Sequence, residues 1–301
     1  MQRTSCCGKE REAMEKEPKT ILCYGDSNTY GLMPAPGGRY PYRKRWTTLL
    51  GRQLGEGYIV VPEGLTGRTT AFDREEAPWK NGLAPLKAVI GSHVPVDIFI
   101  VMLGTNDTIP EVGASAEQIA DGMEQVLLAA KEAFEELQEE QPAVILAVPA
   151  PIGDAYEQST DTGALDMGAY IKSRQIAGLY EQLAEKHGCT FVNMQEAEVS
   201  AIDSEHLTER GHEQVAAKML QAVRSLEEQA AEAPAENTEA ETTAVMQYEI
   251  TDDCIGCGYC LGVCPGICIN GSHIPFVIDQ EKCQHCGACL DVCQADAVAL
   301  I

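Results

Sequence analysis

The chain has 301 residues, enough for one sizeable domain and a smaller one, with 22 Lys and Arg against 46 Asp and Glu. The formal net charge of -24 argues against nucleic acid and anionic membrane surfaces as partners, because both require a cationic protein surface. The sequence has no apolar run long enough to span a membrane, and its polar start lacks the apolar centre of a signal peptide, so we expect a cytoplasmic protein.

Residues 1–18 are charged and aperiodic and predict a disordered tail. From residue 20 onward, short apolar runs alternate with helical periodicity. The runs that predict strands are 20–24, 58–63, 96–103, 143–151 and 190–194. The patterns that predict helices are 46–54, 116–139, 168–187 and 208–228. Strand-helix alternation with apolar strands predicts a parallel sheet covered by helices on both faces, in a domain of residues 19–226.

An acidic segment follows the last of these helices. Residues 225–246 read SLEEQAAEAPAENTEAETTAVM, with six glutamates, no Lys or Arg, and almost no large apolar side chain. The preceding helix can extend into this segment until Pro234 stops it. We therefore expect an acidic, solvated linker over residues 227–245 and a separate domain over 246–301.

The last expected domain contains an internal repeat. The stretch CIGCGYCLGVC from residue 254 and the stretch CQHCGACLDVC from residue 283 align cysteine for cysteine, which indicates a duplication. Nine of the 13 cysteines of the chain lie between residues 254 and 293. Because this clustering occurs in a chain without an export signal, it indicates metal binding and not a disulfide framework.

Polar residues suited to nucleophilic catalysis lie at the ends of the expected strands and ahead of the last helix. A serine hydroxyl acts as a nucleophile when a base takes its proton, another group orients that base, and donors bind the oxyanion. The carboxyl ends of parallel strands meet at one edge of a sheet, so residues that follow them gather there. The candidates are Ser27 in GDSN, Gly67 in EGLTGRTT, Asn106 in LGTND, and Asp203 with His206 in AIDSEHLT.

The spacing within these stretches fits a division of roles. Asp203 and His206 are three residues apart, which lets the carboxylate reach Nδ1 while Nε2 faces Ser27. The side chain of Asn106 and the backbone N–H groups of Gly67 and Ser27 supply three donors for one oxyanion. Each stretch alone also occurs in ordinary turns and helix caps, so a protein that binds without turnover is the alternative.

The stretches GDSN, GLTGRTT, GTND and DSEH resemble the four sequence blocks of the SGNH (GDSL) hydrolase family, over about residues 20–226. Residues 63–70 and 101–108 are particularly similar to the arylesterase and acyltransferase branch. The resemblance implies a flavodoxin-like, three-layer α/β hydrolase that acts on small acyl esters through an acyl-enzyme. It also implies the roles of nucleophile, base, orienting carboxylate and oxyanion donors for Ser27, His206, Asp203, Gly67 and Asn106, respectively.

The repeated cysteines have the spacing C-x2-C-x2-C-x3-C. Zinc ribbons use pairs separated by a longer loop, whereas three closely spaced thiolates surround one face of a [4Fe-4S] cluster and a remote fourth binds the other cluster. We therefore expect two [4Fe-4S] clusters. The first would be held by Cys254, Cys257, Cys260 and Cys293, and the second by Cys264, Cys283, Cys286 and Cys289. We expect Cys268, which lies outside both sets, to be a spare buried thiol.

Residues 246–301 resemble a bacterial two-cluster ferredoxin domain, which implies a small α+β fold and electron transfer. The acidic residues of this segment outnumber its single base, Lys282, and favour a basic redox protein as partner. The alternative is that the clusters only stabilise a domain too small to fold unaided.

Together these patterns predict a serine esterase or acyltransferase tethered to an electron-transfer module. The alternative function is an electron-transfer ferredoxin whose hydrolase-like half is a binding or docking module. We expect Asp26 and Asp107 to fix their loops through backbone hydrogen bonds. We also expect His93, His187 and His212 on the surface, because the sequence near them shows no partner.

Overall fold

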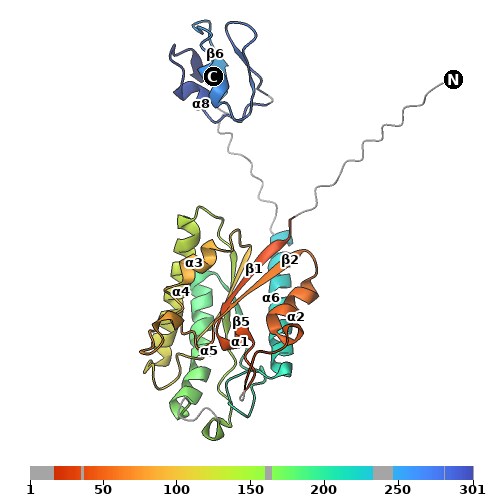
Figure 1. The fold of residues 1–301 in the computed structure, drawn as a ribbon, viewed down its shortest axis with the longest axis vertical. Coiled ribbons are helices and arrows are strands. Elements are labelled where there is room, and N and C mark those ends of the chain that lie inside the picture. The colour runs from red at the N-terminus through yellow and green to blue at the C-terminus, as the bar shows by residue number, and fades with distance from the viewer. Residues whose placement is uncertain (1–16, 35–36, 160–164, 233–246, 281, 301) are drawn as a thin grey trace, which may run out of the picture. The chain divides into compact units, whose positions relative to one another are not determined.

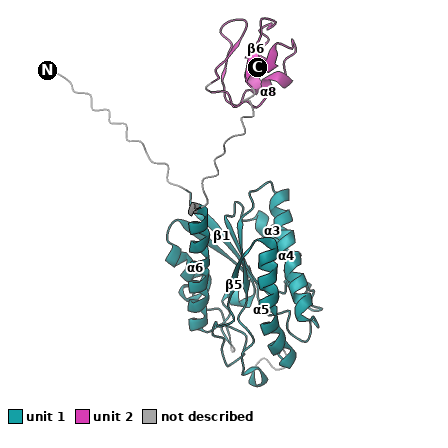
Figure 2. Cartoon of the chain, turned by 180° about the vertical axis from the view of Figure 1, so that it is seen from behind, with its two compact units in different colours: residues 1–230 teal, residues 231–301 magenta. Residues whose placement is uncertain are grey.

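The computed structural model describes residues 17–34, 37–159, 165–232, 247–280 and 282–300. The chain divides into two compact units, residues 1–230 and 231–301 (Figure 2). The expected N-terminal tail lies outside the described residues except for its last two positions. Within the described ranges, no helix combines the length and the apolar character needed to cross a membrane.

The first unit is built on a five-stranded parallel sheet with the strand order β2-β1-β3-β4-β5. This order is the flavodoxin-like one, so the expected parallel sheet and fold class are confirmed. Each expected strand range contains or overlaps one observed strand. The strands are β1 (Lys19–Gly25), β2 (Tyr58–Gly64), β3 (Ile98–Met102), β4 (Ala143–Val148) and β5 (Thr190–Asn193).

Helices cover both faces of this sheet (Figure 1). One face packs against α3 (Leu86–Gly91), α4 (Ala116–Glu136) and α5 (Met167–His187). The other face packs against α2 (Trp46–Leu54) and α6 (Glu209–Glu232). The sequence patterns did not indicate α3 or the four-residue helix α1 (Ser27–Tyr30). They also gave no sign of the 3-10 turns η1 (Tyr42–Lys44), η2 (Pro78–Lys80) and η3 (Tyr156–Gln158).

Successive side chains of the central strands point to opposite faces of the sheet and so belong to two separate cores, one on each face. In β1, Leu22 and Tyr24 pack toward α4 and α5, whereas Ile21 and Cys23 pack toward α2 and α6. Successive side chains of a strand point to opposite faces, so a strand with apolar residues at every position needs cover on both sides. Full burial of one such aliphatic side chain stabilises the fold by about 1.5–3 kcal/mol. The continuous apolar run in β1 therefore dictates the three-layer arrangement.

The long helices begin and end at residues suited to those positions. Ser115 and Gln118 form a reciprocal capping box at the start of α4. Asp166 accepts a hydrogen bond from the backbone of Ala169 at the start of α5, and Gly188 ends that helix in the left-handed conformation. These caps place the loops at both ends of the sheet in defined positions.

Helix α6 continues to Glu232 and so includes the first residues of the expected linker. Lys19 Nζ lies 3.1 Å from Glu227 Oε1, which also contacts the Tyr58 hydroxyl, so Glu227 packs against the first two strands. Residues 233–245 of the expected linker lie outside the described residues.

The second unit is a small α+β structure. Strand β6 (Tyr248–Ile250) pairs antiparallel with β9 (Val298–Leu300), and β7 (Ile269–Asn270) pairs antiparallel with β8 (Val277–Ile278). Two short helices, α7 (Tyr259–Val263) and α8 (Ala288–Asp291), begin at equivalent positions of the two repeats. Each follows a left-handed glycine, Gly258 or Gly287. The repeat in the sequence is therefore also a repeat in the structure.

Candidate functional site

Ser27 lies directly beyond the carboxyl end of β1. The strand ends at Gly25, and the carboxylate of Asp26 accepts a hydrogen bond from the backbone of Asn28 at 2.9 Å, which starts α1. Helix α1 lies close to the end of β2, where a Cβ on Gly64 would stand 2.1 Å from the backbone nitrogen of Tyr30. A glycine is required at this approach, and it allows Ser27 to sit at the edge of the sheet.

The structure brings the predicted nucleophile, base and orienting carboxylate into one hydrogen-bonded chain. The His206 ring has Nε2 3.0 Å from the Ser27 hydroxyl and Nδ1 3.0 Å from Asp203 Oδ2. The other carboxylate oxygen of Asp203 accepts the backbone N–H groups of His206 and Glu205 at 3.2 and 3.3 Å. The carboxylate is therefore fixed by three hydrogen bonds, and it fixes the imidazole in turn.

The charges around Ser27, His206 and Asp203 favour a protonated imidazole beside an ionised carboxylate, which proton transfer requires. Burial alone would lower the pKa of His206, but its hydrogen bond with Asp203 and the charges of Glu205, Asp203 and Asp26 raise that pKa above its ordinary value. Burial alone would raise the pKa of Asp203, but the hydrogen bonds from His206 and Glu205 lower it. Asp203 consequently stays ionised and stabilises a proton on the imidazole.

Three donor groups, the side chain of Asn106 and the backbone N–H groups of Gly67 and Ser27, are the candidates for the predicted oxyanion site. Gly67 has a left-handed φ of +77°, and a Cβ on it would lie 2.8 Å from Lys80 Nζ, so only glycine fits without strain. Asn106 Nδ2 donates one hydrogen bond to the Arg68 carbonyl at 3.1 Å, which leaves its second N–H for another acceptor. The backbone N–H groups of Ser27 and Gly67 bind no acceptor among the described residues.

Sequence reasoning missed Arg68, which follows Gly67 and ties the Gly67 loop to the ends of two strands. Its side chain is buried and donates to the carbonyl of Gly25 at 2.9 Å and to that of Glu63. The guanidinium also lies 4.0 Å from the centre of the Tyr24 ring. Arg68 therefore joins the ends of β1 and β2, while its own carbonyl holds Asn106. In the sequence, the available sign of this role was a basic residue directly after Gly67 in GLTGRTT.

Two buried carboxylates support the same loops, as expected. Asp26 bonds the backbone of Asn28, and Asp107 Oδ1 accepts from the backbone N–H and the hydroxyl of Thr70 at 2.8 and 2.6 Å. Burial is the main cause that raises the pKa of each carboxyl to about 6. Both side chains anchor loops and neither contacts the imidazole in the described hydrogen bonds.

The expectation of a surface position is wrong for His212. This ring is fully buried, accepts the backbone N–H of Trp46 at 3.3 Å, and packs edge-on against Tyr40. Burial lowers its pKa to about 4. His93 and His187 are half-buried and pair with Glu63 and Glu124. These contacts come from distant segments, so the sequence near each histidine gave no sign of them.

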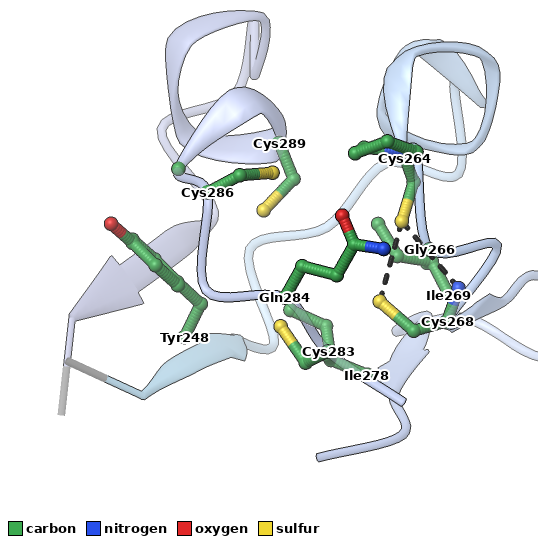
Figure 3. Close-up of a pocket in the computed structure, with 12 residues that line it drawn as sticks. Tyr248, Cys264, Gly266, Cys268, Ile269, Ile278, Cys283, Gln284, Cys286 and Cys289 are labelled. Atoms are coloured by element: carbon green, nitrogen blue, oxygen red, sulfur yellow. Dashed lines mark hydrogen bonds between the residues drawn. The ribbon is translucent and has the colours of Figure 1, made fainter. Parts of the chain in front are cut away.

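In the second unit the eight predicted cysteine ligands surround two separate hollows. No group of three metal-binding side chains among the described residues converges on one point for a single ion. The first hollow is lined by Cys254, Cys257, Cys260 and Cys293. The second is lined by Cys264, Cys283, Cys286 and Cys289 (Figure 3). The grouping is the one expected from the spacing, and the ligand roles stay a prediction.

The chemistry of both hollows fits an iron-sulfur cluster. Four of the predicted ligands line each one, and the remaining walls are largely apolar, with Phe276 at the first and Ile278 at the second. Backbone N–H groups point at cysteine sulfurs, as from His285 to Cys283 at 3.4 Å, and such bonds tune cluster potentials. Sulfur ligands suit iron-sulfur clusters better than hard cations.

Cys268 is a fifth thiol at the second hollow (Figure 3). Its sulfur lies 3.3 Å from that of Cys264, and its backbone N–H donates to the same sulfur at 3.4 Å. Ala297 occupies the equivalent place in the other repeat and donates its backbone N–H to Cys293 at 3.2 Å. Cys268 is buried, as expected, and the second hollow has this one thiol more than the first.

A doubly wound sheet that joins serine, imidazole and carboxylate at its carboxyl edge defines an α/β serine hydrolase. Residues 23–214 match the GDSL-like Lipase/Acylhydrolase family, and the chain belongs to this family. Residues 235–298 match the 4Fe-4S dicluster domain, so the second unit is an iron-sulfur domain. Both resemblances noted in the sequence are thereby confirmed.

Solved structures of esterases are similar to the first unit. A carbohydrate acetylesterase from Sinorhizobium meliloti is 31% identical, with a TM-score of 0.63, covering 69% of this chain and 99% of that one. The aryl esterase of M. smegmatis is also 31% identical, with a TM-score of 0.65 and the same coverage. No curated protein sequence matches this chain. Together with the family, these structures identify the protein as a serine ester hydrolase.

Proposed function

We propose that the first unit cleaves small acyl esters through an acyl-enzyme on Ser27. The observation that carries this proposal is the hydrogen-bonded chain from Asp203 through His206 to the Ser27 hydroxyl, with both distances at 3.0 Å. In this mechanism His206 Nε2 takes the hydroxyl proton as the oxygen attacks the acyl carbon. The same nitrogen then gives that proton to the leaving alcohol, and an acyl group remains on Ser27.

The oxyanion is held by donors from three segments. The backbone N–H groups of Ser27 and Gly67 and the second N–H of Asn106 Nδ2 converge on the acyl oxygen, where negative charge develops. A water or an alcohol, activated by His206, then attacks the acyl-enzyme and regenerates the serine. Attack by water completes hydrolysis, whereas attack by an alcohol completes acyl transfer.

The similar structures favour short acyl groups as substrates. One is named as a carbohydrate acetylesterase and the other as an aryl esterase. We propose acetyl and other short-chain esters of aryl or sugar alcohols for this chain. The alternative in which the hydrolase half only binds is disfavoured, because the nucleophile, base and orienting carboxylate are all present and connected.

The test is hydrolysis of aryl acetates by the full chain and by Ser27→Ala. The variant is expected to lose at least about 10⁴-fold in kcat, because no other group can form the acyl-enzyme. A matched control is Ser92→Ala, which changes an exposed serine whose hydroxyl donates to the carbonyl of Ala88. Full activity in Ser27→Ala would overturn the assignment of the nucleophile.

For the second unit we propose two [4Fe-4S] clusters, one for each hollow. Cys254, Cys257, Cys260 and Cys293 would hold the first, and Cys264, Cys283, Cys286 and Cys289 the second. Such clusters supply one-electron transfer at low potential when bound. The chain itself contributes the thiolates, the backbone N–H bonds to sulfur and the apolar walls.

We further propose that this unit transfers electrons to or from a basic redox protein. Its surface is acidic, with Glu249, Asp252, Asp253, Asp291 and Asp296 exposed, and its one described lysine pairs with Asp279 at 2.7 Å. Apolar side chains such as Ile255 and Ile267 are also exposed and suit the centre of a docking surface. Three measurements on anaerobically purified protein test this proposal. They are an iron assay, a sulfide assay, and a reductive titration followed by electron paramagnetic resonance. Clusters that cannot be reduced would favour a purely structural role.

We propose the domain limits that the sequence predicts: the hydrolase over residues 19–226, an acidic linker over 227–245, whose first residues continue α6, and the iron-sulfur domain over 246–301. We propose a cytoplasmic location, because the cysteines of the described residues are free thiols and iron-sulfur ligation requires reduced thiols. Fractionation of cells that produce the full chain checks this location.

A further inference from the structure

Asn28 follows the proposed nucleophile in the chain, and its side chain contacts the loop of the proposed base. Its Nδ2 donates to the carbonyl of Glu205 at 3.1 Å, and its Oδ1 accepts the backbone N–H of Leu207 at 2.9 Å. These two peptide groups flank His206 on either side. One amide therefore holds both chain neighbours of the imidazole, although about 180 residues separate the two segments.

The orientation of this amide is fixed by its partners. The carbonyl of Glu205 can only accept and the N–H of Leu207 can only donate, so a turned amide would face two repulsive contacts. Asn28 is 2% exposed, which leaves little access for water to replace either bond. Its own backbone N–H donates to Asp26 at 2.9 Å, so the amide is tied to the turn that presents Ser27.

The loop that carries the base has little regular structure of its own. A single antiparallel bridge joins its ends, Val199 and Leu207, and the backbone N–H of Ser200 donates to the carbonyl of His206 at 2.8 Å. These bonds shape the loop but do not join it to α1. Beyond the bond between Ser27 and His206 itself, Asn28 supplies the described hydrogen bonds between α1 and this loop.

We propose that Asn28 is a positioning residue that sets the distance between the Ser27 hydroxyl and the His206 imidazole. This inference rests on the proposed roles of Ser27 and His206. An error of about 1 Å in such a distance lowers a rate by roughly 100-fold. Asn28 reaches the reacting atoms only through the backbone that it holds, so it affects the chemical step and leaves substrate binding unchanged.

The first experiment compares Asn28→Ala with Asn81→Ala in the full chain. Asn81 makes the same kind of paired contact elsewhere, donating to the Ala71 carbonyl at 3.2 Å and accepting the Leu83 N–H at 2.8 Å. Thermal unfolding of both variants shows that each is folded. For aryl acetate hydrolysis we expect a 10- to 100-fold lower kcat with an unchanged KM in Asn28→Ala, and values near wild type in Asn81→Ala. Equal kcat in the two variants would overturn the inference.

A second measurement does not need turnover. The ¹⁵N resonance of His206 Nε2 responds to its hydrogen bond with Ser27, so Ser27→Ala should change it in the wild-type background. The same substitution should change it little when Asn28 is already alanine, because the bond is then loosened. An undiminished response would count against a positioning role even if kcat falls. Conversely, a lost response in a protein that cleaves no ester would support the role of Asn28 and refute the proposed function.

Discussion

The two units assemble their functional side chains in different ways. In the hydrolase unit the chain itself holds the site, because Asp203, His206 and Ser27 are joined by hydrogen bonds above a sheet with two large apolar cores. In the iron-sulfur unit the core consists of nine buried side chains among the described residues, and Cys260, Cys268 and Cys289 are three of them. Two of the expected ligands, Cys260 and Cys289, are thus part of its core. This difference indicates that folding of the chain completes the hydrolase site, whereas the iron-sulfur site is completed by the group that it binds.

The comparison is sharpened most by Asp203→Asn, which should change chemistry without changing the fold. The asparagine oxygen can still accept the backbone N–H groups of Glu205 and His206, which now bond Asp203 Oδ1. Its NH2 group would face Nδ1 and favour the wrong tautomer of the ring. We expect kcat for an aryl acetate to fall about 10³- to 10⁴-fold, as measured by steady-state kinetics.

The control for this substitution is Asp154→Asn. That carboxylate pairs with Arg174 and with the hydroxyl of Tyr170 on the surface, and its loss should leave kcat unchanged. A decrease of less than 10-fold in Asp203→Asn would mean that the carboxylate does not orient the base.

Removal of iron should unfold the iron-sulfur unit and leave the hydrolase unit almost unaffected. A core in which a third of the buried members are cysteines is too small to offset the conformational entropy of about 50 residues without the bound group. We expect residues 247–300 to lose protection in hydrogen exchange after anaerobic chelation, while ester hydrolysis changes less than about twofold.

The double variant Cys257→Ser with Cys286→Ser tests the same point without a chelator. It removes one expected ligand from each hollow and should reproduce the loss of protection. Persistent protection in either sample would contradict a fold that depends on the clusters. A large change in hydrolysis would instead show that the two units are coupled.

Within the iron-sulfur unit, Cys264 and Cys268 provide a finer test. Their sulfurs lie 3.3 Å apart at the same hollow, but only Cys264 belongs to the repeated spacing. We expect Cys264→Ala to reduce iron from about eight to about four atoms per chain, and Cys268→Ala to retain about eight. Iron and sulfide assays on anaerobically purified samples distinguish the two variants. Full iron in Cys264→Ala would mean that Cys268 can replace its neighbour as a ligand.

Regular periods made most of the fold predictable from the sequence. The limits of α2 match the expected range, 46–54, because its apolar positions repeat with helical spacing. Helix α1 has only four residues and no period, and it forms through the cap at Asp26 and the left-handed Gly31. Such a helix depends on local geometry that hydrophobic patterning does not report.

The candidate site was predictable only where the chemistry requires a particular residue type. The serine, the histidine and the repeated cysteines are recognisable for that reason, whereas Arg68 and Asn28 act by joining segments far apart in the chain. His212 shows the same limit, since its partner Trp46 lies 166 residues away. Contacts of this kind depend on the tertiary structure, which local sequence patterns do not specify.

The smallest expected effect concerns the loss of stability that a buried carboxylate causes in the hydrolase unit. Asp107 is fully buried, and burial together with the nearby charge of Asp26 raises its pKa from 3.8 to about 6. The folded state therefore binds this proton more tightly than the unfolded state, and stability decreases as the pH rises between about 4 and 6. Above pH 6 the buried charge destabilises the fold in full, and below pH 4 the penalty disappears.

Asp107→Asn should remove this dependence. The amide oxygen can still accept both hydrogen bonds from Thr70, and the new NH2 group would replace Oδ2, which has no hydrogen-bond partner among the described residues, so burial of this group offsets part of the gain. We expect a net stabilisation of about 1–2 kcal/mol at pH 8 that vanishes near pH 4. Urea unfolding followed by tryptophan fluorescence reports on this unit alone, because Trp46 and Trp79 both lie in it. The exposed Asp121→Asn serves as control and should show no such difference, and a stabilisation of Asp107→Asn that is equal at both pH values would refute the buried-charge account.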